Sequence, residues 1–164
     1  MRRIALLSAA VLTLAGCAPL EPYTGETAYI VTGECEGVEV IVNYGKLAKR
    51  KSFCVETSEA MNAKEVLSEA GVTIQGTAAY GDQIVCRVNG LPSADEPVVV
   101  PGQEPHVETC ASMPPAFAYW GLWEKANAEA EWEYAKEGVG SLMLEPGQSI
   151  GLAFATGGKT PTPN

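Results

Sequence analysis

Four cysteines in this sequence have the number and spacing of a disulfide framework. Cys35, Cys54, Cys86 and Cys110 form an even set, which in an exported chain indicates two disulfides with three possible pairings. We predict Cys35–Cys54 and Cys86–Cys110, because each pair brackets a strand and its neighbouring loop. Each bridge should contribute about 3 to 4 kcal/mol by restricting the unfolded chain. A zinc site is not expected, because the sequence has no Cys-x-x-Cys pair and one histidine, His106.

The N-terminus has the features of an export signal. Two arginines precede an apolar run over residues 4–14, which is shorter than the roughly 20 residues of a membrane-spanning helix. The run ends in Leu14-Ala15-Gly16-Cys17, which is similar to a bacterial lipobox. We therefore predict a signal peptide (1–16), a lipid anchor on Cys17 and a place on the extracytoplasmic face of the membrane. The alternative is an ordinary secretory signal in which the cysteine is incidental.

The groups that could catalyse a reaction lack the partners that catalysis needs. A nucleophilic Ser or Cys requires a base within hydrogen-bonding reach, and His106 lies in a loop rich in Pro and Glu. Acidic residues at 129, 131 and 133 share one side of a predicted strand, which is typical of a solvated surface. The glycines at 138 and 140 do not form a phosphate-binding loop. We predict that the protein is not an enzyme.

Aromatic residues favour a binding role. Residues 114–123 hold two of the three tryptophans, and Trp and Tyr provide large, stiff contacts at binding hot spots. Because strand residues alternate between faces, Trp120 and Trp123 lie on opposite sides and one of them must face the core. Arg87 on a preceding strand could hold a carboxylate or phosphate at two points. The alternative interpretation is that this run is simply the main core strand.

The charge balance limits the partners. Without the two N-terminal arginines, nine basic side chains remain against twenty acidic ones, a net charge of −11. This balance argues against nucleic acid, because phosphate contacts need clustered Lys and Arg. The one basic cluster, residues 46–51, either contacts anionic lipid or cell-wall polymer or is a solvated hairpin connection. We favour the solvated connection.

Hydrophobic periodicity predicts the elements that position these residues. Apolar residues alternate over 38–44 and a returning strand follows at 52–56. A helix is predicted over 62–70, with Asn62 as its N-cap and Gly71 as its left-handed stop. A weak strand is predicted at 72–75, and further strands are predicted at 83–88, 119–123, 131–134 and 150–154.

Turns and loops separate these strands. Asn89-Gly90 is a strong hairpin dipeptide after the strand at 83–88. Residues 91–115 contain six prolines and no regular period, so they predict a long loop. The expected Cys86–Cys110 bridge favours an ordered loop.

The order of these elements predicts an α+β fold. One amphipathic helix against a mixed sheet, with two disulfides, is most compactly built as a β-grasp-like domain. We assign the signal peptide to 1–16, a spacer to 17–34, the β-grasp domain to 35–155 and a disordered tail to 156–164.

Several short pieces occur in an order that resembles a known family. They are the helix end Val66–Gly71, the strand Tyr80-Gly81…Val85, the turn Val88–Gly90, the strand that contains Tyr119-Trp120, and the turn Pro146-Gly147. Their order over residues 37–155 resembles the β-grasp domain that closes transcobalamin-like proteins, and related small domains of unknown function in exported bacterial proteins. The resemblance implies a fold that binds a soluble ligand. In transcobalamin itself it implies cobalamin held against a helical partner domain, which is absent from this sequence.

We predict a lipid-anchored, extracytoplasmic, non-enzymatic module that binds a small soluble ligand such as cobalamin or presents it to a membrane partner. No other cofactor and no metal is expected. The alternative is an envelope protein that docks another protein through the loop 89–115, for example as an inhibitor would. The resemblance implies that the contacts include the Val88–Gly90 turn and the Tyr119-Trp120 strand. The predicted contact residues are Arg87, Asn89, Gly90, Tyr119, Trp120 and Trp123.

Overall fold

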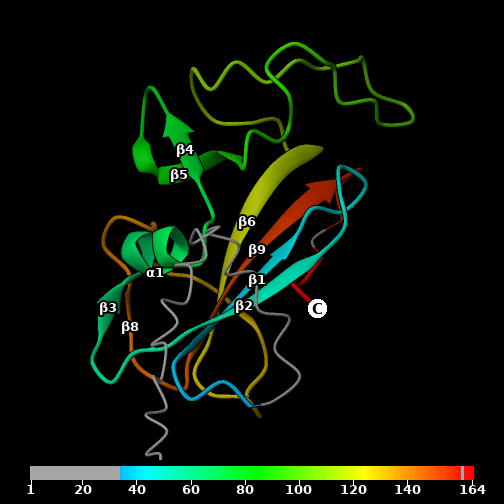
Figure 1. Ribbon diagram of the computed structural model, residues 1–164. Helices are drawn as coiled ribbons and strands as arrows, with labels where there is room; N and C mark the ends of the chain where they lie inside the picture. The colour runs from blue at the N-terminus through cyan, green and yellow to red at the C-terminus, as the bar shows by residue number, and fades with distance from the viewer. Residues whose placement is uncertain (1–33, 160) are drawn as a thin grey trace, which may run out of the picture.

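The computed structural model of this protein describes residues 34–159 and 161–164. Strands dominate these residues and a single helix accompanies them, so the fold is mixed α+β (Figure 1). The predicted signal peptide (1–16), Cys17 and all of the spacer except Glu34 lie outside the described residues. The elements are β1 (Val38–Asn43), β2 (Lys51–Val55), β3 (Met61–Asn62), α1 (Ala63–Glu69), β4 (Ile74–Thr77), β5 (Gly81–Val88), β6 (Ala118–Lys125), β7 (Glu133–Tyr134), β8 (Met143–Leu144) and β9 (Ser149–Thr156).

The main sheet has five strands in the order β2-β1-β9-β6-β7. β1 and β2 form an antiparallel hairpin, while β1 and the last strand, β9, run parallel at the centre of the sheet. β6 and β7 complete the sheet in antiparallel pairs. The strands predicted from alternating apolar residues at 38–44, 119–123 and 150–154 are confirmed as β1, β6 and β9.

The helix begins and ends where its caps predict. The Asn62 side chain accepts a hydrogen bond from the Lys64 backbone amide at 3.0 Å, as an N-cap does. At the other end, Gly71 has a φ of 67°, and two backbone hydrogen bonds close the last turn: the Gly71 amide donates to the Ser68 carbonyl and the Val72 amide to the Leu67 carbonyl. The buried stripe of Ala63, Val66 and Leu67 packs on the sheet, so α1 covers one face of it.

Two small sheets flank the helix on the same side of the main sheet (Figure 1). β3 pairs with β8, and β4 pairs with β5 across a register that shifts on both sides of Gly76. Asn89 and Gly90 both have positive φ, at 50° and 75°, so the hairpin turn predicted at this dipeptide is confirmed. β4 begins two residues later than the predicted weak strand at 72–75.

Both predicted disulfides are confirmed. Cys35–Cys54 ties the chain before β1 to the edge strand β2, and Cys86–Cys110 ties β5 to the long loop before β6. Two such bridges indicate an oxidising, extracytoplasmic environment. Within residues 34–159 and 161–164, no helix has the length and apolar character that crossing a membrane requires.

The two faces of the main sheet are both covered. On the helix side, Trp120 lies in the main core with Phe154 and Leu152. On the opposite face, Trp123 packs with Ile41, Trp132 and Ala153 in a second, smaller core. The alternation predicted for the two indoles therefore holds, yet each is only 6% exposed because each face has its own cover.

The C-terminal segment provides part of that cover. We expected residues 156–164 to be disordered, but β9 continues to Thr156 and Pro163 is fully buried. Gly151 explains the burial, since a side chain there would overlap the ring of Pro163. The Asn43 amide also donates a hydrogen bond to the Thr162 carbonyl at 3.4 Å. The residue pattern of the tail does not predict this burial, because the space that receives Pro163 is at Gly151, on β9.

Replacing Gly151 by alanine should detach the C-terminal segment. The added methyl group would overlap Pro163 and come within 3.0 Å of Trp132, so we expect a loss of about 1 to 2 kcal/mol in the free energy of unfolding. Urea unfolding measures this loss, and carboxypeptidase should remove residues 161–164 faster from Gly151→Ala. Gly140→Ala is the control, because its methyl group would meet its nearest neighbour at 3.6 Å. In a protein that lacks residues 161–164, Gly151→Ala should lower the free energy of unfolding much less than it does in the full chain. An equal loss in both proteins would contradict the explanation.

Candidate docking site on the stapled loop

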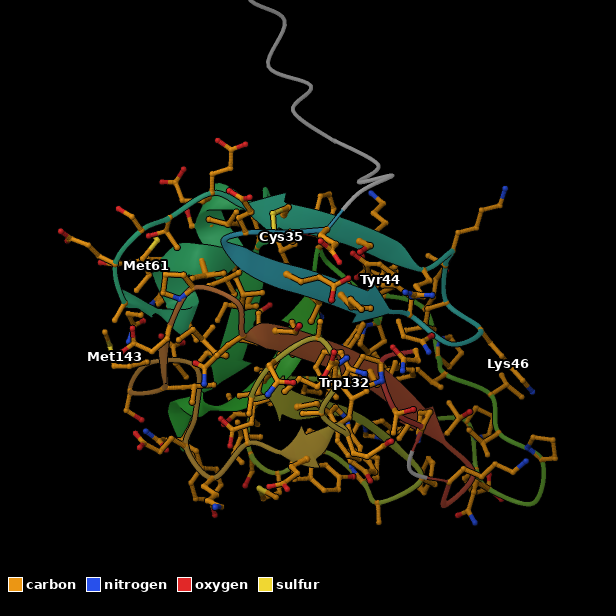
Figure 2. The ribbon with its side chains drawn as sticks, turned by 90° about the horizontal axis from the view of Figure 1, so that it is seen from below. Cys35, Tyr44, Lys46, Met61, Trp132 and Met143 are labelled. Carbon is orange, nitrogen blue, oxygen red and sulfur yellow. A yellow bond between two sulfur atoms is a disulfide. The ribbon has the colours of Figure 1, made fainter. Side chains whose placement is uncertain are left out.

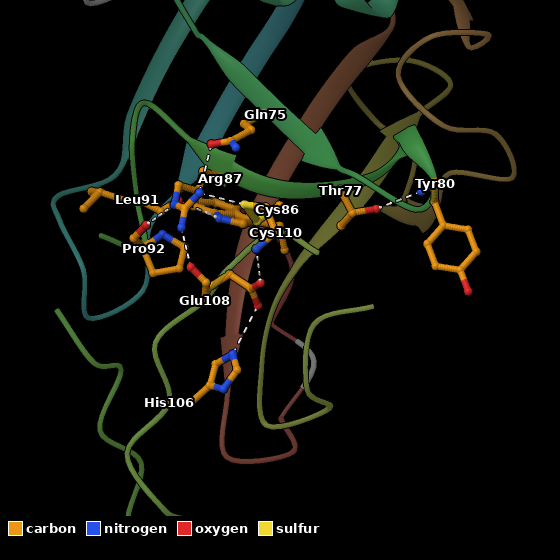
Figure 3. The surroundings of a disulfide bond; sticks show 11 residues. Gln75, Thr77, Tyr80, Cys86, Arg87, Leu91, Pro92, His106, Glu108 and Cys110 are labelled. Atoms are coloured by element: carbon orange, nitrogen blue, oxygen red, sulfur yellow. Dashed lines mark hydrogen bonds and ion pairs between the residues drawn. A yellow bond between two sulfur atoms is a disulfide. The ribbon is translucent and has the colours of Figure 1, made fainter. Parts of the chain in front are cut away.

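Arg87 is the centre of a buried hydrogen-bond cluster behind the Cys86–Cys110 bridge (Figure 3). Its Nε donates to the Pro92 carbonyl at 2.9 Å and one terminal nitrogen donates to Gln75 Oε1 at 2.9 Å. That nitrogen also lies 2.7 Å from Cys110 Sγ, and the other terminal nitrogen donates to the Glu108 carbonyl. Arg87 is 7% exposed, so its guanidinium fastens both ends of the long loop instead of facing a ligand.

Glu108 fixes the same loop from within. Its carboxylate is buried, accepts the Cys110 backbone amide at 2.7 Å and lies 3.3 Å from Nε2 of His106. The His106 ring meets Phe117 edge-on, with ring centres 6.1 Å apart. Each polar group of this cluster therefore has an internal partner.

A small hairpin forms the middle of the loop. Val98 and His106 exchange backbone hydrogen bonds of 2.7 and 3.1 Å. Between them, Gln103 donates to the Val100 carbonyl across Pro101-Gly102, and Gly102 has the positive φ, 82°, that such a turn needs. The six-proline segment thus has its own turn, its own backbone pairing and a disulfide.

Asn89 and Trp120 both contact Tyr44, so the three side chains form an internal network. Asn89 accepts the Thr73 backbone amide at 2.8 Å and donates to the Tyr44 hydroxyl at 2.7 Å. The Tyr44 and Trp120 rings meet edge-on at 5.6 Å, and the Trp120 indole donates to the Leu91 carbonyl at 3.0 Å. Burial raises the pKa of the Tyr44 hydroxyl, and the hydrogen bond from Asn89 partly offsets this effect. Within the predicted Val88–Gly90 turn, Val88 is buried, Asn89 is half-buried and Gly90 is exposed.

Tyr119 and Trp123 lie together on the other face of β6. Trp123 is stacked against Tyr134 with ring centres 3.9 Å apart, and the hydroxyls of Tyr119 and Tyr134 lie within 3.3 Å. Tyr134 is 45% exposed and covers Trp123. Within the described residues, the indole nitrogens of Trp123 and Trp132 have no hydrogen-bond partner. Contact through Trp120 or Trp123 would therefore require these buried rings to be uncovered.

Exposed apolar side chains gather where the β4–β5 turn meets the end of the long loop. Ala78 donates its backbone amide to the Cys110 carbonyl at 2.7 Å, and Ala79 donates to Ala111 at 3.1 Å. Tyr80 is 49% exposed and projects away from the disulfide cluster (Figure 3), and Met113 is 60% exposed. We name this surface the docking patch; its residues are Ala78, Ala79, Tyr80, Ala111 and Met113.

No charged residue occurs in either segment that forms the docking patch, over 76–81 or over 109–123. Because 19% of all residues are charged, two uncharged segments of this kind are a signal that is visible in the sequence. The patch was not predicted, because the strongest aromatic signal in the sequence comes from the tryptophans, which lie outside it. Tyr80 and Met113 are therefore candidate contact residues that we had not predicted.

Three of the cavities on the described residues lie away from the docking patch. The largest, about 500 Å³, is lined partly by Glu34, Glu36 and Glu39, and the Glu39 carboxylate accepts hydrogen bonds from Ser52 and Ser149. The others measure about 270 and 200 Å³. None of the three has an aromatic wall, which is the usual lining of a small-molecule site.

One buried group has the composition of a metal site. Cys86, Glu108 and Cys110 bring their ligand atoms within 4.8 Å of one another. Both sulfurs are joined in the disulfide, so neither is the thiolate that a metal would need.

The chain matches no family model, no curated protein and no solved structure.

Proposed function

We propose that this domain is a β-grasp domain related to the one in transcobalamin-like proteins. Three features support the proposal: an N-terminal hairpin, a helix that follows it, and a first and last strand that are parallel neighbours at the centre of the sheet. The Asn89-Gly90 turn and the Pro146-Gly147 turn before β9 fit the order of the resemblance. The proposed relation concerns the fold and does not identify the contact surface.

We propose that Cys17 carries a lipid that holds the domain at the extracytoplasmic face of the membrane. The lipobox-like tetrapeptide supports this assignment, and so do the two disulfides, which require export to an oxidising environment. One myristoyl-like chain gives only marginal membrane binding, whereas two acyl chains give stable anchoring.

Replacing Cys17 by serine should release the protein into the medium, because the acylated thiol is lost. Immunoblotting of membrane and medium fractions measures the shift. Replacing Ser8, an uncharged residue inside the apolar run, by alanine is the control and should leave the protein with the membrane. Retention in membranes of a Cys17→Ser protein that has lost residues 1–16, as shown by its mass, would contradict acylation at this residue.

For the domain itself, we propose a non-enzymatic module that docks onto another protein of the envelope through the docking patch. The observation that carries this proposal is an uncharged, exposed surface held by two backbone hydrogen bonds and one disulfide. A patch that is already rigid loses little conformational entropy on binding, so more of the contact energy contributes to affinity. Tyr and Met are enriched at the cores of such interfaces.

The other function classes have less support. All four cysteines of residues 34–159 are in disulfides, so none supplies a thiolate nucleophile. A small soluble ligand such as cobalamin would need an enclosing wall, and the three cavities described above have no aromatic lining. We therefore rank protein docking above capture of a soluble ligand.

A photo-crosslinking amino acid tests the docking patch in living cells. Placed at Tyr80 or Met113, it should give an adduct of one discrete mass, whereas at Met143, which is 54% exposed, it should give none. Met113→Asp should reduce the amount of adduct formed from position 80 at least about tenfold, because a charge at the centre of an apolar interface weakens binding. The same variant should keep its melting temperature. Equal adducts from positions 80 and 143, or none from position 80, would contradict docking through this patch.

A further inference from the structure

Positive charge gathers at one end of a strongly acidic molecule. Three of the nine basic side chains outside the signal peptide lie on the β1–β2 connection and a fourth, Lys51, begins β2; no acidic residue occurs between Glu39 and Glu56. A fifth, Lys159, follows β9. All five side chains are exposed. We name this surface the basic end; its residues are Lys46, Lys49, Arg50, Lys51 and Lys159.

The fold brings the basic end against the small hairpin of the long loop. A cavity of about 200 Å³ is lined by Lys46 from the β1–β2 connection, by Lys159 from the segment after β9 and by residues 99–101 of the hairpin. Val99 is 69% exposed, the highest value among the large apolar side chains described as exposed. Lys46 projects from one end of the molecule, opposite to Met61 and Met143 (Figure 2). Ammonium groups and an apolar tip therefore share one surface.

We propose that the basic end binds the phosphate head groups of an anionic phospholipid membrane, with Val99 entering the interfacial layer. Clustered lysines and arginines are attracted to anionic lipid, and an adjacent apolar group adds burial. The remainder of the domain is acidic and is repelled by the same surface, so contact at this end also sets the orientation. The acidic residues nearest in the chain, Asp95 and Glu96 before the hairpin and Glu104 within it, do not line the cavity.

A membrane explains this surface better than a dissolved polyanion. A soluble anionic polymer would neutralise the five charges but would leave Val99 in water. The inference rests on the proposed lipid tether for proximity to the bilayer: 18 residues from Cys17 to Glu34 span at most roughly 60 Å. Within that reach, a weak electrostatic contact is enough to orient the domain, because the tether makes the contact intramolecular.

The test measures the accessibility of lysines on the lipid-anchored protein, residues 17–164, in vesicles of phosphatidylglycerol or phosphatidylcholine. A water-soluble acetylating reagent labels exposed lysines, and mass spectrometry of a digest gives the rate at each site. We expect labelling of Lys46 and Lys159 to be about fivefold slower on phosphatidylglycerol. Lys136, which is exposed and outside the basic end, should label at one rate on both. The Val99→Asp protein should lose the protection at Lys46 at an unchanged melting temperature.

Three results would overturn the proposal. They are equal labelling of Lys46 on both lipids, equal slowing at Lys136, and protection on phosphatidylcholine vesicles by added poly(glycerol phosphate) that matches the protection by phosphatidylglycerol. The last result would identify a polymer as the occupant. The intact mass of the same preparation shows whether Cys17 is acylated, so a failure of the tether is distinguished from a failure of this surface.

Discussion

Replacing Arg87 by alanine should lower the free energy of unfolding by about 3 kcal/mol, because buried acceptors would lose the charged donor that satisfies them in the native protein. The guanidinium donates to the carbonyls of Pro92 and Glu108 and to the Gln75 side chain, at a site that is 7% exposed. Gln75 and Glu108 do not replace the donor, since both already act as acceptors through their side-chain oxygens. We therefore expect the loop before β6 to lose its fixed position as well.

Urea unfolding followed by circular dichroism measures this loss, and limited proteolysis measures the loop. Arg87→Lys should recover only part of the stability, because one ammonium cannot reach acceptors on both sides of the loop. Lys136→Ala is the matched control for loss of a positive charge at an exposed position and should change stability by under about 0.5 kcal/mol. A stable Arg87→Ala protein with an unchanged cleavage pattern would show that the disulfide alone orders the loop.

Local patterns in the sequence predicted most of the fold. Alternating valines predicted β1, the N-cap Asn62 and the stop Gly71 predicted α1, and Asn89-Gly90 predicted the turn after β5. The cysteine pairs were predictable for a similar reason, because each bridge joins neighbouring elements separated by 19 and 24 residues. These features depend on contacts within a short stretch of chain.

The features that the sequence did not predict depend on distant contacts. Arg87 has the composition of a ligand-binding residue, and only the folded loop, 5 to 23 residues further on, shows that its partners are internal. Pro163 is buried because Gly151 leaves space on another strand. The docking patch arises where two segments about 30 residues apart are joined by backbone hydrogen bonds. Neither segment is distinctive by itself, apart from its lack of charge.

Trp120 is the predicted contact residue whose role is most sharply testable, because a core role and a contact role predict opposite results. The ring lies between Tyr44 and Phe154, with ring centres 5.6 and 5.2 Å away, and its indole donates to the Leu91 carbonyl. A core role therefore predicts a loss of about 4 kcal/mol in Trp120→Ala and about 2 kcal/mol in Trp120→Phe, which keeps a ring but loses the hydrogen bond.

The midpoint of urea unfolding, followed by circular dichroism, measures both losses, with Met143→Ala as the control for an exposed apolar residue on a strand. Below its melting temperature, Trp120→Phe should still form the adduct from a crosslinker at position 80, because the docking patch does not include the indole. If Trp120→Phe instead kept its unfolding midpoint and lost the adduct, the indole would be a contact residue. The partner would then have to reach it by displacing the turn at Leu91, whose carbonyl accepts the indole hydrogen bond.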